Sequence, residues 1–281
     1  MLAVDLHSHS NISDGILAPR DVVARAAERG CRLFALTDHD DVRGLAEAAA
    51  EAASRGMQFV NGVEISVSWC KHTLHIVGLG IDPANPQLQE GLRSVRSGRE
   101  ERAGRMAQAL SAAGIEGTLE GARRYADNPE MIGRAHFARY LVERGIAKDM
   151  RSVFKKYLAK GKPGYVPHEW ASLQDAVSWI KAAGGVAVIA HPGRYEFGKG
   201  TMLDLIAEFK ALGGEAIEVV SGSHGVDDTA RAARYAREHG LKASAGSDYH
   251  ATGEGAREPG ILPALPNGCE PVWSAWLDTD A

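Results

Sequence analysis

The sequence predicts an α/β fold, with a parallel sheet enclosed by helices as a barrel or as a doubly wound sheet. Two observations support this prediction. Short apolar segments alternate with longer segments of helical periodicity along most of the chain. Polar clusters directly follow the apolar segments, and ligand groups in parallel α/β folds gather at such strand ends.

The first part of the chain predicts four strands and two helices. An amphipathic helix over 18–29 ends at Gly30, and an Ala-rich helix over 42–55 ends at Gly56. A loop around Trp69 and Cys70 joins the last two of these strands. The predicted strands cover residues 2–6, 32–36, 58–63 and 73–79.

The last part of the chain repeats the alternation. Ser172 is a suitable N-cap for a helix over 173–183, which Gly184 and Gly185 stop. A polar tail rich in glycine and proline follows Ala251, and we expect it on the surface. The other predicted helices cover 203–212 and 226–239, and the strands cover 186–190, 216–220 and 241–245.

Residues 87–167 interrupt this rhythm, because they show only helical patterns, for example over 132–143. We interpret them as a small helical insertion domain that contributes substrate contacts. The flanking residues 1–86 and 168–281 then form the main domain. A basic loop punctuated by glycine and proline, residues 155–163, closes the insertion.

Composition narrows the class of protein. The chain has 281 residues, of which 44% are hydrophobic and 24% charged, so it is rich enough in apolar residues to bury a core. The net charge of −4 argues against duplex DNA or an anionic membrane as a partner. Three cysteines without a CxxC pair indicate a reducing compartment. With no signal peptide and no membrane span in the sequence, we expect a cytoplasmic protein.

Histidine is unusually frequent, with eleven residues against six phenylalanines and seven tyrosines. Imidazole and carboxylate side chains bind divalent Zn, Mn and Fe. A bridging carboxylate such as Glu64 would allow more than one ion, and such a cluster clamps phosphoryl groups. Other histidines, such as His72, His168 and His239, are interpreted as ordinary surface residues. The candidate ligands at or near strand ends are His7, His9, Asp14, His39, Glu64, His75, His191, Asp248 and His250.

The motifs that carry these ligands resemble the PHP (polymerase and histidinol phosphatase) family of metal-dependent phosphoesterases. They occur in the family's order at residues 5–10, 13–15, 37–40, 62–64, 75, 190–192 and 246–250. Residues 132–136 and 157–163 resemble the insert of the TrpH-like branch. The resemblance implies a distorted (β/α)7 barrel with two to three divalent ions, manganese being favoured over Zn, Fe or Mg.

The resemblance also implies which residues hold each ion. His7, His9, Glu64 and Asp248 would hold the first. Glu64 would bridge to a second ion, held also by His75 and His191. Asp14, His39 and His250 would hold a third. Every one of these positions carries the residue type that the family uses.

The activity implied is hydrolysis of a phosphate ester of a small nucleotide by a hydroxide that bridges the metals. The favoured reaction removes the 3′-phosphate of nucleoside 3′,5′-bisphosphates, such as adenosine 3′,5′-bisphosphate, to give AMP and phosphate. Trimming of short 5′-phosphorylated RNA from its 5′ end, as a 5′-3′ exoribonuclease, is the alternative. His191, Asp248 and Arg134 are the predicted catalytic residues.

Both substrates carry a second phosphate that requires a cation away from the metals. Arg134 is the favoured residue, because its guanidinium matches phosphate oxygens and lies near a predicted helix start. His136, Lys162 and His224 are further candidates, although a solvated basic loop and a flexible rim loop explain the last two equally well. Asp38 and Asp40 flank His39, and one of them would orient an imidazole, with a helix N-cap as the alternative role for Asp40.

Two more distant readings remain open. One is an amidohydrolase-type deacylase. Comparing release of phosphate from nucleotides with cleavage of amides would distinguish it from a phosphoesterase. The other is a non-catalytic accessory module, which the intact ligand set disfavours and which a protein without bound metal would support. The oligomeric state is left open.

Overall fold

The computed structural model describes residues 3–255 and 257–276. Its sheet is nearly closed, because the backbone N–H of Leu6, directly after the first strand of the order, donates to the carbonyl of Ala245 in the last strand at 2.9 Å. The order is β1 (Val4–Asp5), β2 (Leu33–Leu36), β3 (Gln58–Trp69), β4 (His72–Leu79), β6 (Val186–Ile189), β7 (Ala216–Ser221) and β8 (Lys242–Gly246), with β5 (Ala171–Ser172) beside β3.

Strand β4 departs from the predicted parallel arrangement. It runs antiparallel to both of its neighbours, β3 and β6, whereas the other neighbouring pairs of named strands are parallel. Only Cys70 and Lys71 connect β3 to β4, and both adopt positive φ angles of 45° and 65°. A two-residue connection can form a hairpin but cannot cross over to a parallel strand. The α/β barrel that the sequence predicts is otherwise confirmed.

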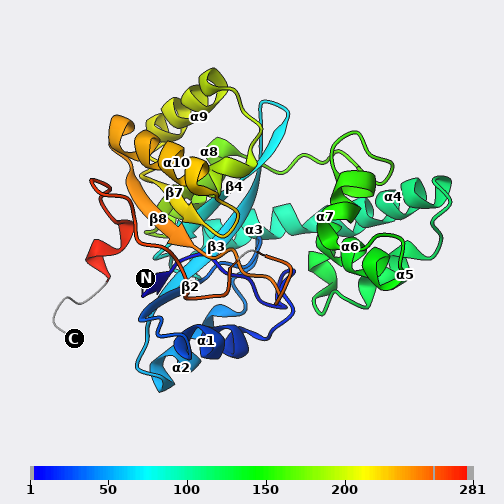
Figure 1. Cartoon of the computed structure of the whole chain (residues 1–281), viewed down its shortest axis with the longest axis horizontal. Coiled ribbons are helices and arrows are strands. Elements are labelled where there is room, and N and C mark those ends of the chain that lie inside the picture. Colours follow the sequence, from blue (N-terminus) through cyan, green and yellow to red (C-terminus); the bar gives the residue numbers. More distant parts are fainter. Residues whose placement is uncertain (1–2, 256, 277–281) are drawn as a thin grey trace.

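Helices cover the outside of the barrel on opposite sides (Figure 1). Helix boundaries follow local signals: Pro19 opens α1, and the Ser172 side chain accepts the Asp175 N–H at 3.0 Å to cap α8. The enclosing helices are α1 (Pro19–Ala27), α2 (Leu45–Ser54), α8 (Leu173–Ala182), α9 (Lys199–Ala211) and α10 (Val226–His239).

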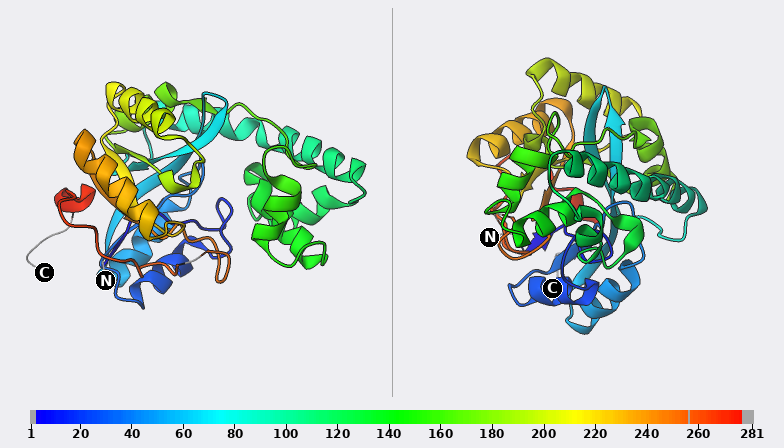
Figure 2. Two further views of the ribbon diagram at one scale, coloured as in Figure 1. Left: turned by 45° about the horizontal axis from the view of Figure 1, so that its top comes forward. Right: turned by 90° about the vertical axis from the view of Figure 1, so that its right-hand side faces the viewer.

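The other helices extend to one side of the barrel in Figures 1 and 2. They are α3 (Pro86–Ser97), α4 (Arg99–Ala112), α5 (Thr118–Arg123), α6 (Arg134–Glu143) and α7 (Met150–Val153), which continues into a π-helical turn (Phe154–Leu158). Buried residues of α4–α7, such as Met106, Phe137 and Leu141, form a second hydrophobic cluster apart from the barrel core. Those of α3, such as Leu92, belong to the barrel core. The division at residues 87 and 167 stays a prediction.

None of the helices in the described part of the chain is both long enough and apolar enough to cross a membrane. The predicted first strand includes residue 2, and the predicted tail includes residues 256 and 277–281. These positions lie outside the described residues.

Candidate metal centre

Nine predicted ligands converge at one end of the barrel. His7 and His9 follow β1, His39 follows β2, His191 follows β6, and Asp248 and His250 follow β8. Asp14 lies in the loop before α1, while Glu64 and His75 lie within β3 and β4. Bridges between neighbouring backbones fix this geometry, since Ser8 pairs with Tyr249 and His39 pairs with Glu64.

The carboxylate of Glu64 is the hub of the cluster and is fully buried. Five imidazoles surround it. Burial raises the pKa of the Glu64 carboxyl, but four of these imidazoles outweigh burial and hold the pKa well below its usual range: those of His75, His39, His7 and His191. Its Oε1 lies 2.9 Å from His75 Nδ1, 3.0 Å from His191 Nε2 and 3.3 Å from His7 Nε2, and its Oε2 lies 2.9 Å from His39 Nδ1 and 3.3 Å from His9 Nε2.

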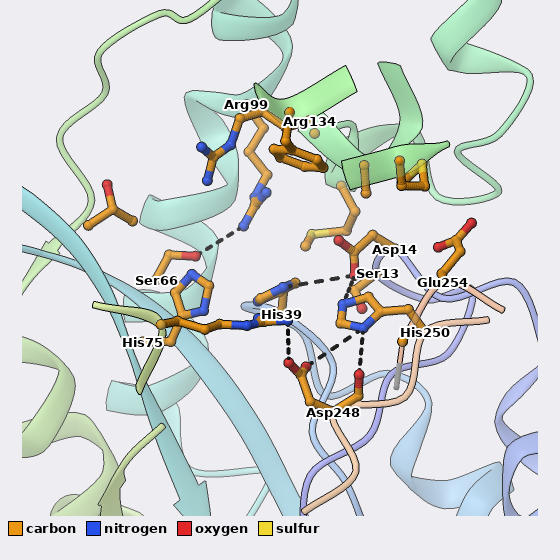
Figure 3. Close-up of a pocket in the computed structure, with 18 of the residues that line it drawn as sticks. Ser13, Asp14, His39, Ser66, His75, Arg99, Arg134, Asp248, His250 and Glu254 are labelled. Carbon is orange, nitrogen blue, oxygen red and sulfur yellow. Dashed lines mark hydrogen bonds and ion pairs between the residues drawn. The ribbon is translucent and has the colours of Figure 1, made fainter. Parts of the chain in front are cut away.

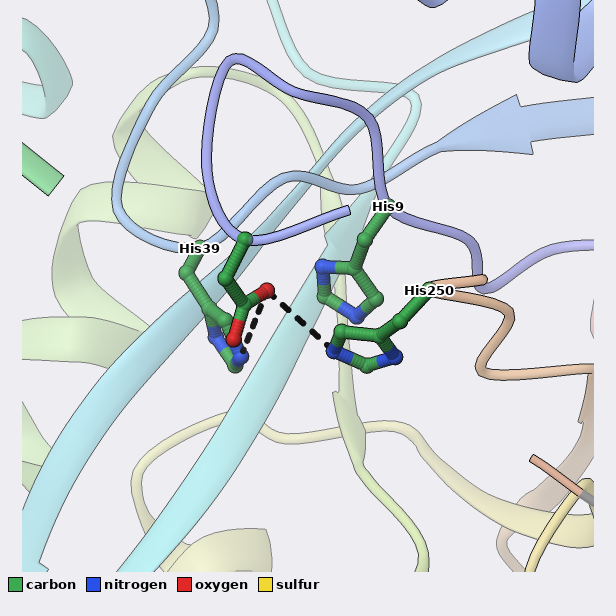
Figure 4. A group of neighbouring side chains, drawn as sticks. His9, His39 and His250 are labelled. Atoms are coloured by element: carbon green, nitrogen blue, oxygen red, sulfur yellow. Dashed lines mark ion pairs between the residues drawn. The ribbon is translucent and has the colours of Figure 1, made fainter. Parts of the chain in front are cut away.

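A second carboxylate joins the cluster from its cavity side. Asp14 Oδ1 lies 3.2 Å from His250 Nε2 and 3.8 Å from His39 Nε2. Figure 4 shows these two rings together with His9, whose ring centroid lies 4.1 Å from that of His250. Burial and the neighbouring imidazoles lower the pKa of His9 to about 3. The ring is therefore neutral, as a metal ligand requires.

The donors form four groups whose ligand atoms lie within 4.8 Å of one another. His7, His9, His39 and Glu64 each belong to two groups, so the groups share ligands as a multinuclear centre does. The groups are His9, Asp14, His39 and His250; His7, His9 and Asp248; His7, Glu64 and His191; and His39, Glu64 and His75. These sets overlap the three predicted ones but place His9 beside Asp14 and His39 beside His75. The assignment of ligands to individual ions stays a prediction.

The donor set fits divalent metal ions. Asp14 Oδ1, His39 Nδ1 and Glu64 Oε2 are buried and, apart from close contacts among the side chains of the cluster itself, make no hydrogen bond with the described residues. Buried polar atoms are normally satisfied, so several at one point indicate a missing partner. Imidazole and carboxylate suit Zn, Mn and Fe.

Glu218 supports the cluster, although the sequence analysis did not select it. Its Oε1 lies 2.7 Å from His7 Nδ1, and its Oε2 accepts the backbone N–H of His191 at 2.6 Å. Three non-glycine residues at or beside the cluster adopt positive φ angles: Asp40 (48°), His191 (27°) and Asp248 (52°). Such conformations persist only where the surroundings hold them, as they do here.

Asp38 and Asp40 brace backbone rather than orient an imidazole. Asp38 accepts hydrogen bonds from Ser10 N, Ser10 Oγ and Ser13 Oγ at 2.8, 2.6 and 2.6 Å, and so holds the loop that leads to Asp14. Asp40 accepts the N–H and Oγ–H of Ser66 at 2.8 and 2.9 Å and forms an ion pair with Arg99.

A cavity of about 410 Å³ lies between the cluster and the helices beside the barrel. Asp14, His39, His75, Asp248 and His250 line its barrel side. The opposite wall carries cationic and aromatic side chains, and Figure 3 shows Arg99 and Arg134 across the cavity from His39 and His250. Residues of that wall include Arg99, Arg102, Arg134, Phe154 and Trp170.

The predicted substrate-binding residues separate in space. Arg134 lines the cavity, whereas Lys162 is exposed on a turn outside it. His136 is buried, and its Nδ1 accepts the Gly133 N–H at 3.0 Å at the start of α6. His224 Nε2 accepts the Gly193 N–H at 3.0 Å. Their roles in substrate binding stay predictions. The catalytic roles of Asp248, which lines the cavity, and of His191, which lies behind the cavity wall, also stay predictions.

The cavity carries further cationic side chains besides Arg134 that were not predicted from the sequence. Arg99 and Arg102 lie on one face of α4, over the Trp170 ring at 4.8 and 5.1 Å from its centroid. Arg194 lies just after His191. The sequence held a signal for the first two, because arginines three positions apart on a helix share a face.

Comparisons with known proteins agree with this geometry. The chain is 60% identical over 273 residues to a 3′,5′-nucleoside bisphosphate phosphatase of Chromobacterium violaceum, covering 97% of this chain and 96% of that one. It is 43% identical over 274 residues to the 5′-3′ exoribonuclease Rnm of Escherichia coli, covering 97% and 93%.

Solved structures also resemble this one. A Chromobacterium violaceum amidohydrolase with bound sulfate and no metal superposes with a TM-score of 0.96 at 59% identity, covering 98% of this chain and 96% of that one. A protein from Bifidobacterium adolescentis that is assigned to the metal-dependent phosphoesterases gives a TM-score of 0.80 at 26% identity, covering 96% of this chain and 92% of that one. The family model of the PHP domain matches residues 5–166. The chain therefore belongs to the PHP domain family.

Proposed function

We propose that this protein is a divalent-metal-dependent phosphoesterase that removes the 3′-phosphate from nucleoside 3′,5′-bisphosphates. The observation that carries the proposal is the separation of two kinds of charged group across one cavity. Metal-type ligands lie at one side, and arginines lie at the other. A substrate with one phosphate at each side would satisfy both. The 60% identity to a phosphatase of this class, over nearly the whole chain, supports the same substrate.

The arginine side is short of negative charge. Arg102 and Arg134 have no carboxylate oxygen within 4 Å among residues 3–255 and 257–276, and Asp40 is the single ion-pair partner of Arg99 there. Burial, together with Arg134 and Arg99, lowers the pKa of Arg102 to about 9. Buried cations without partners are costly, so a bound anion would stabilise them. A guanidinium group matches phosphate oxygens in charge and shape.

The side chains divide the work as follows. Arg102 and Arg134 bind the 5′-phosphate, while Trp170 and Phe154 offer apolar surface to the nucleoside. Asp14, Glu64 and Asp248, with the six histidines, would hold two to three ions, for which we favour manganese. Divalent ions bound there would supply a nucleophile from water near neutral pH and neutralise phosphoryl charge. Asp248, which lines the cavity, and His191 behind it would act near the leaving 3′-oxygen.

The test compares adenosine 3′,5′-bisphosphate with adenosine 3′-phosphate, each with Mn²⁺, by release of phosphate. The bisphosphate should be the better substrate. In an Arg134→Gln variant, kcat/KM should fall at least tenfold for the bisphosphate and little for the 3′-phosphate, because only the former uses that side chain. Equal losses on both substrates would contradict the proposed division of the cavity. Cleavage of amides without release of phosphate would contradict the proposed function.

The second candidate is 5′-3′ exoribonuclease activity on short 5′-phosphorylated RNA. The 43% identity to Rnm over 97% of this chain favours it. The chemistry is compatible, since the first nucleotide of such RNA has a 5′-phosphate and a phosphodiester at its 3′-oxygen. Comparing kcat/KM for a 5′-phosphorylated trinucleotide and for adenosine 3′,5′-bisphosphate decides which activity is dominant.

A further inference from the structure

Arg194 is a cation of the cavity wall that comes from the barrel, whereas the other arginines of the cavity come from the neighbouring helices. It ends the short turn Pro192–Arg194, directly after His191, and lines the cavity beside Asp248. Its Nη2 lies 2.8 Å from Asp248 Oδ2, while Oδ1 of the same carboxylate faces His9 and His7 at 3.2 and 3.6 Å. The guanidinium therefore occupies the cavity side of a predicted metal ligand.

The pair is loose on the arginine side. Asp248 is 2% exposed, but the Arg194 side chain is 46% exposed and makes one ion pair through one nitrogen within the described chain. Arg139, in contrast, forms a bidentate pair. Its Nε and Nη2 donate to the two carboxylate oxygens of Glu254 at 2.8 and 2.7 Å, and its side chain is 6% exposed. A bidentate pair is held firmly, whereas Arg194 keeps donors free for another acceptor.

The backbone that carries Arg194 is held firmly. The Gly193 N–H donates to His224 Nε2 at 3.0 Å, and His224 Nδ1 lies 3.1 Å from the Val219 carbonyl. A Cβ at Gly193 would lie 2.8 Å from the His224 ring and 3.0 Å from Asp228, so no larger residue fits. His224 thus positions the turn, while the Arg194 side chain extends from it and is half-exposed.

We propose that Arg194 binds the phosphoryl group under attack, and that Asp248 holds its guanidinium over the metal cluster until substrate arrives. This inference rests on the proposed phosphoesterase function. Negative charge on the non-bridging oxygens must be neutralised as the bond to the leaving oxygen breaks, and a guanidinium offers two parallel donors for two of them. Arg102 and Arg134 line the opposite wall, so the two phosphates of a bisphosphate would have separate cationic partners.

The test uses metal-loaded protein and Arg194→Gln, Arg194→Lys and Arg231→Gln variants. Arg231 is the matched control, because it is also 46% exposed and pairs with one carboxylate, Asp228, but lies outside the cavity. Calorimetric titration with inorganic phosphate, in an Arg134→Gln background that weakens the other anion subsite, should show at least tenfold weaker binding in Arg194→Gln. Arg231→Gln should bind phosphate normally.

Kinetics separate this role from a structural one. For adenosine 3′,5′-bisphosphate, kcat should fall about 10²- to 10³-fold in Arg194→Gln, the range for loss of one transition-state donor. Arg194→Lys should recover part of that loss, and metal content should stay at the wild-type level. Unchanged phosphate binding, or a loss of activity that follows a loss of metal, would overturn the proposal. Failure of the wild type to hydrolyse any nucleotide would instead overturn the proposed function, while phosphate binding would still test Arg194.

Discussion

The carboxylate of Glu218 lies 2.7 Å from Nδ1 of His7, on the opposite edge of the ring from Glu64 and Asp248, which face Nε2. A carboxylate at Nδ1 fixes the tautomer that leaves Nε2 free to bind a metal ion. The second carboxylate oxygen of Glu218 accepts the backbone N–H of His191. One buried side chain from the middle of β7 therefore orients two candidate ligands.

We expect Glu218→Gln to lower affinity for divalent ions about 10- to 100-fold, the usual cost of losing such a support. Glutamine offers a single acceptor oxygen, so it cannot serve both His7 and the His191 N–H. Metal affinity, measured by titration with Mn²⁺ after chelation, checks this. Glu215→Gln, which affects a surface pair with Lys181, is the control. Equal affinity in both variants would show that Glu218 does not support the centre.

Asp40 stabilises the fold where β3 meets α4. It is fully buried, accepts two hydrogen bonds from Ser66 and pairs with Arg99, whose side chain is 8% exposed. Asn tolerates the positive φ of this position, so Asp40→Asn isolates the charge. Removing one partner of a buried pair costs about 3–5 kcal/mol in free energy of unfolding.

Urea denaturation of Asp40→Asn checks this expectation. The exposed pair of Glu51 and Arg55 provides the control, because Glu51→Gln should change the free energy of unfolding by less than about 1 kcal/mol. If Asp40→Asn costs no more than Glu51→Gln, the contact between Asp40 and Arg99 contributes little to stability.

His136 should make the protein less stable in mild acid. Burial lowers its pKa from 6.5 to about 4, and its Nδ1 accepts the Gly133 N–H, a contact that protonation would break. Because the folded-state pKa is lower than the unfolded one, the unfolded chain binds the proton first as pH falls below 6.5. Stability is therefore lost between pH 6.5 and 4, by about 2 kcal/mol at pH 5.

An asparagine at this position removes the titration and keeps an acceptor near the place of Nδ1. The difference in free energy of unfolding between pH 7 and pH 5 should be about 2 kcal/mol smaller in His136→Asn than in the wild type. Denaturant titrations at both pH values measure it. Parallel losses in the two proteins would mean that His136 titrates normally in the folded state.

The sequence predicted what depends on local pattern. The helix over 226–239 matches α10, and the nine candidate ligands come together because strand ends share an edge. Helix α9 begins at Lys199 rather than at 203, since no capping residue marks its start. What the sequence missed depends on contacts between distant positions: Glu218 meets His7 across 211 positions and Arg99 meets Asp40 across 59. A glutamate inside the apolar run 216–220 was the available sign of a buried role.

We expect the Arg102 side chain to lower the free energy of unfolding while it contributes to substrate binding. It is 6% exposed, its Nε donates to the Val166 carbonyl at 3.4 Å, and none of the described carboxylates pairs with it. An uncompensated buried charge destabilises the folded state, so Arg102→Met should raise the free energy of unfolding by about 1 kcal/mol or more. The same change removes a cation from the proposed 5′-phosphate subsite. KM for adenosine 3′,5′-bisphosphate should therefore rise about tenfold, while kinetics on adenosine 3′-phosphate stay near the wild type.

Denaturation with and without AMP measures both effects in one experiment. AMP should stabilise the wild type more than Arg102→Met, because ligand binding adds to stability in proportion to the logarithm of affinity. Arg105→Met on the same helix is the control, since Arg105 is 48% exposed and pairs with Glu101. A less stable Arg102→Met protein that still gains fully from AMP would mean that Arg102 supports packing rather than the anion. If Arg102 serves to bind the anion, Arg102→Met should be more stable than the wild type and should bind AMP more weakly.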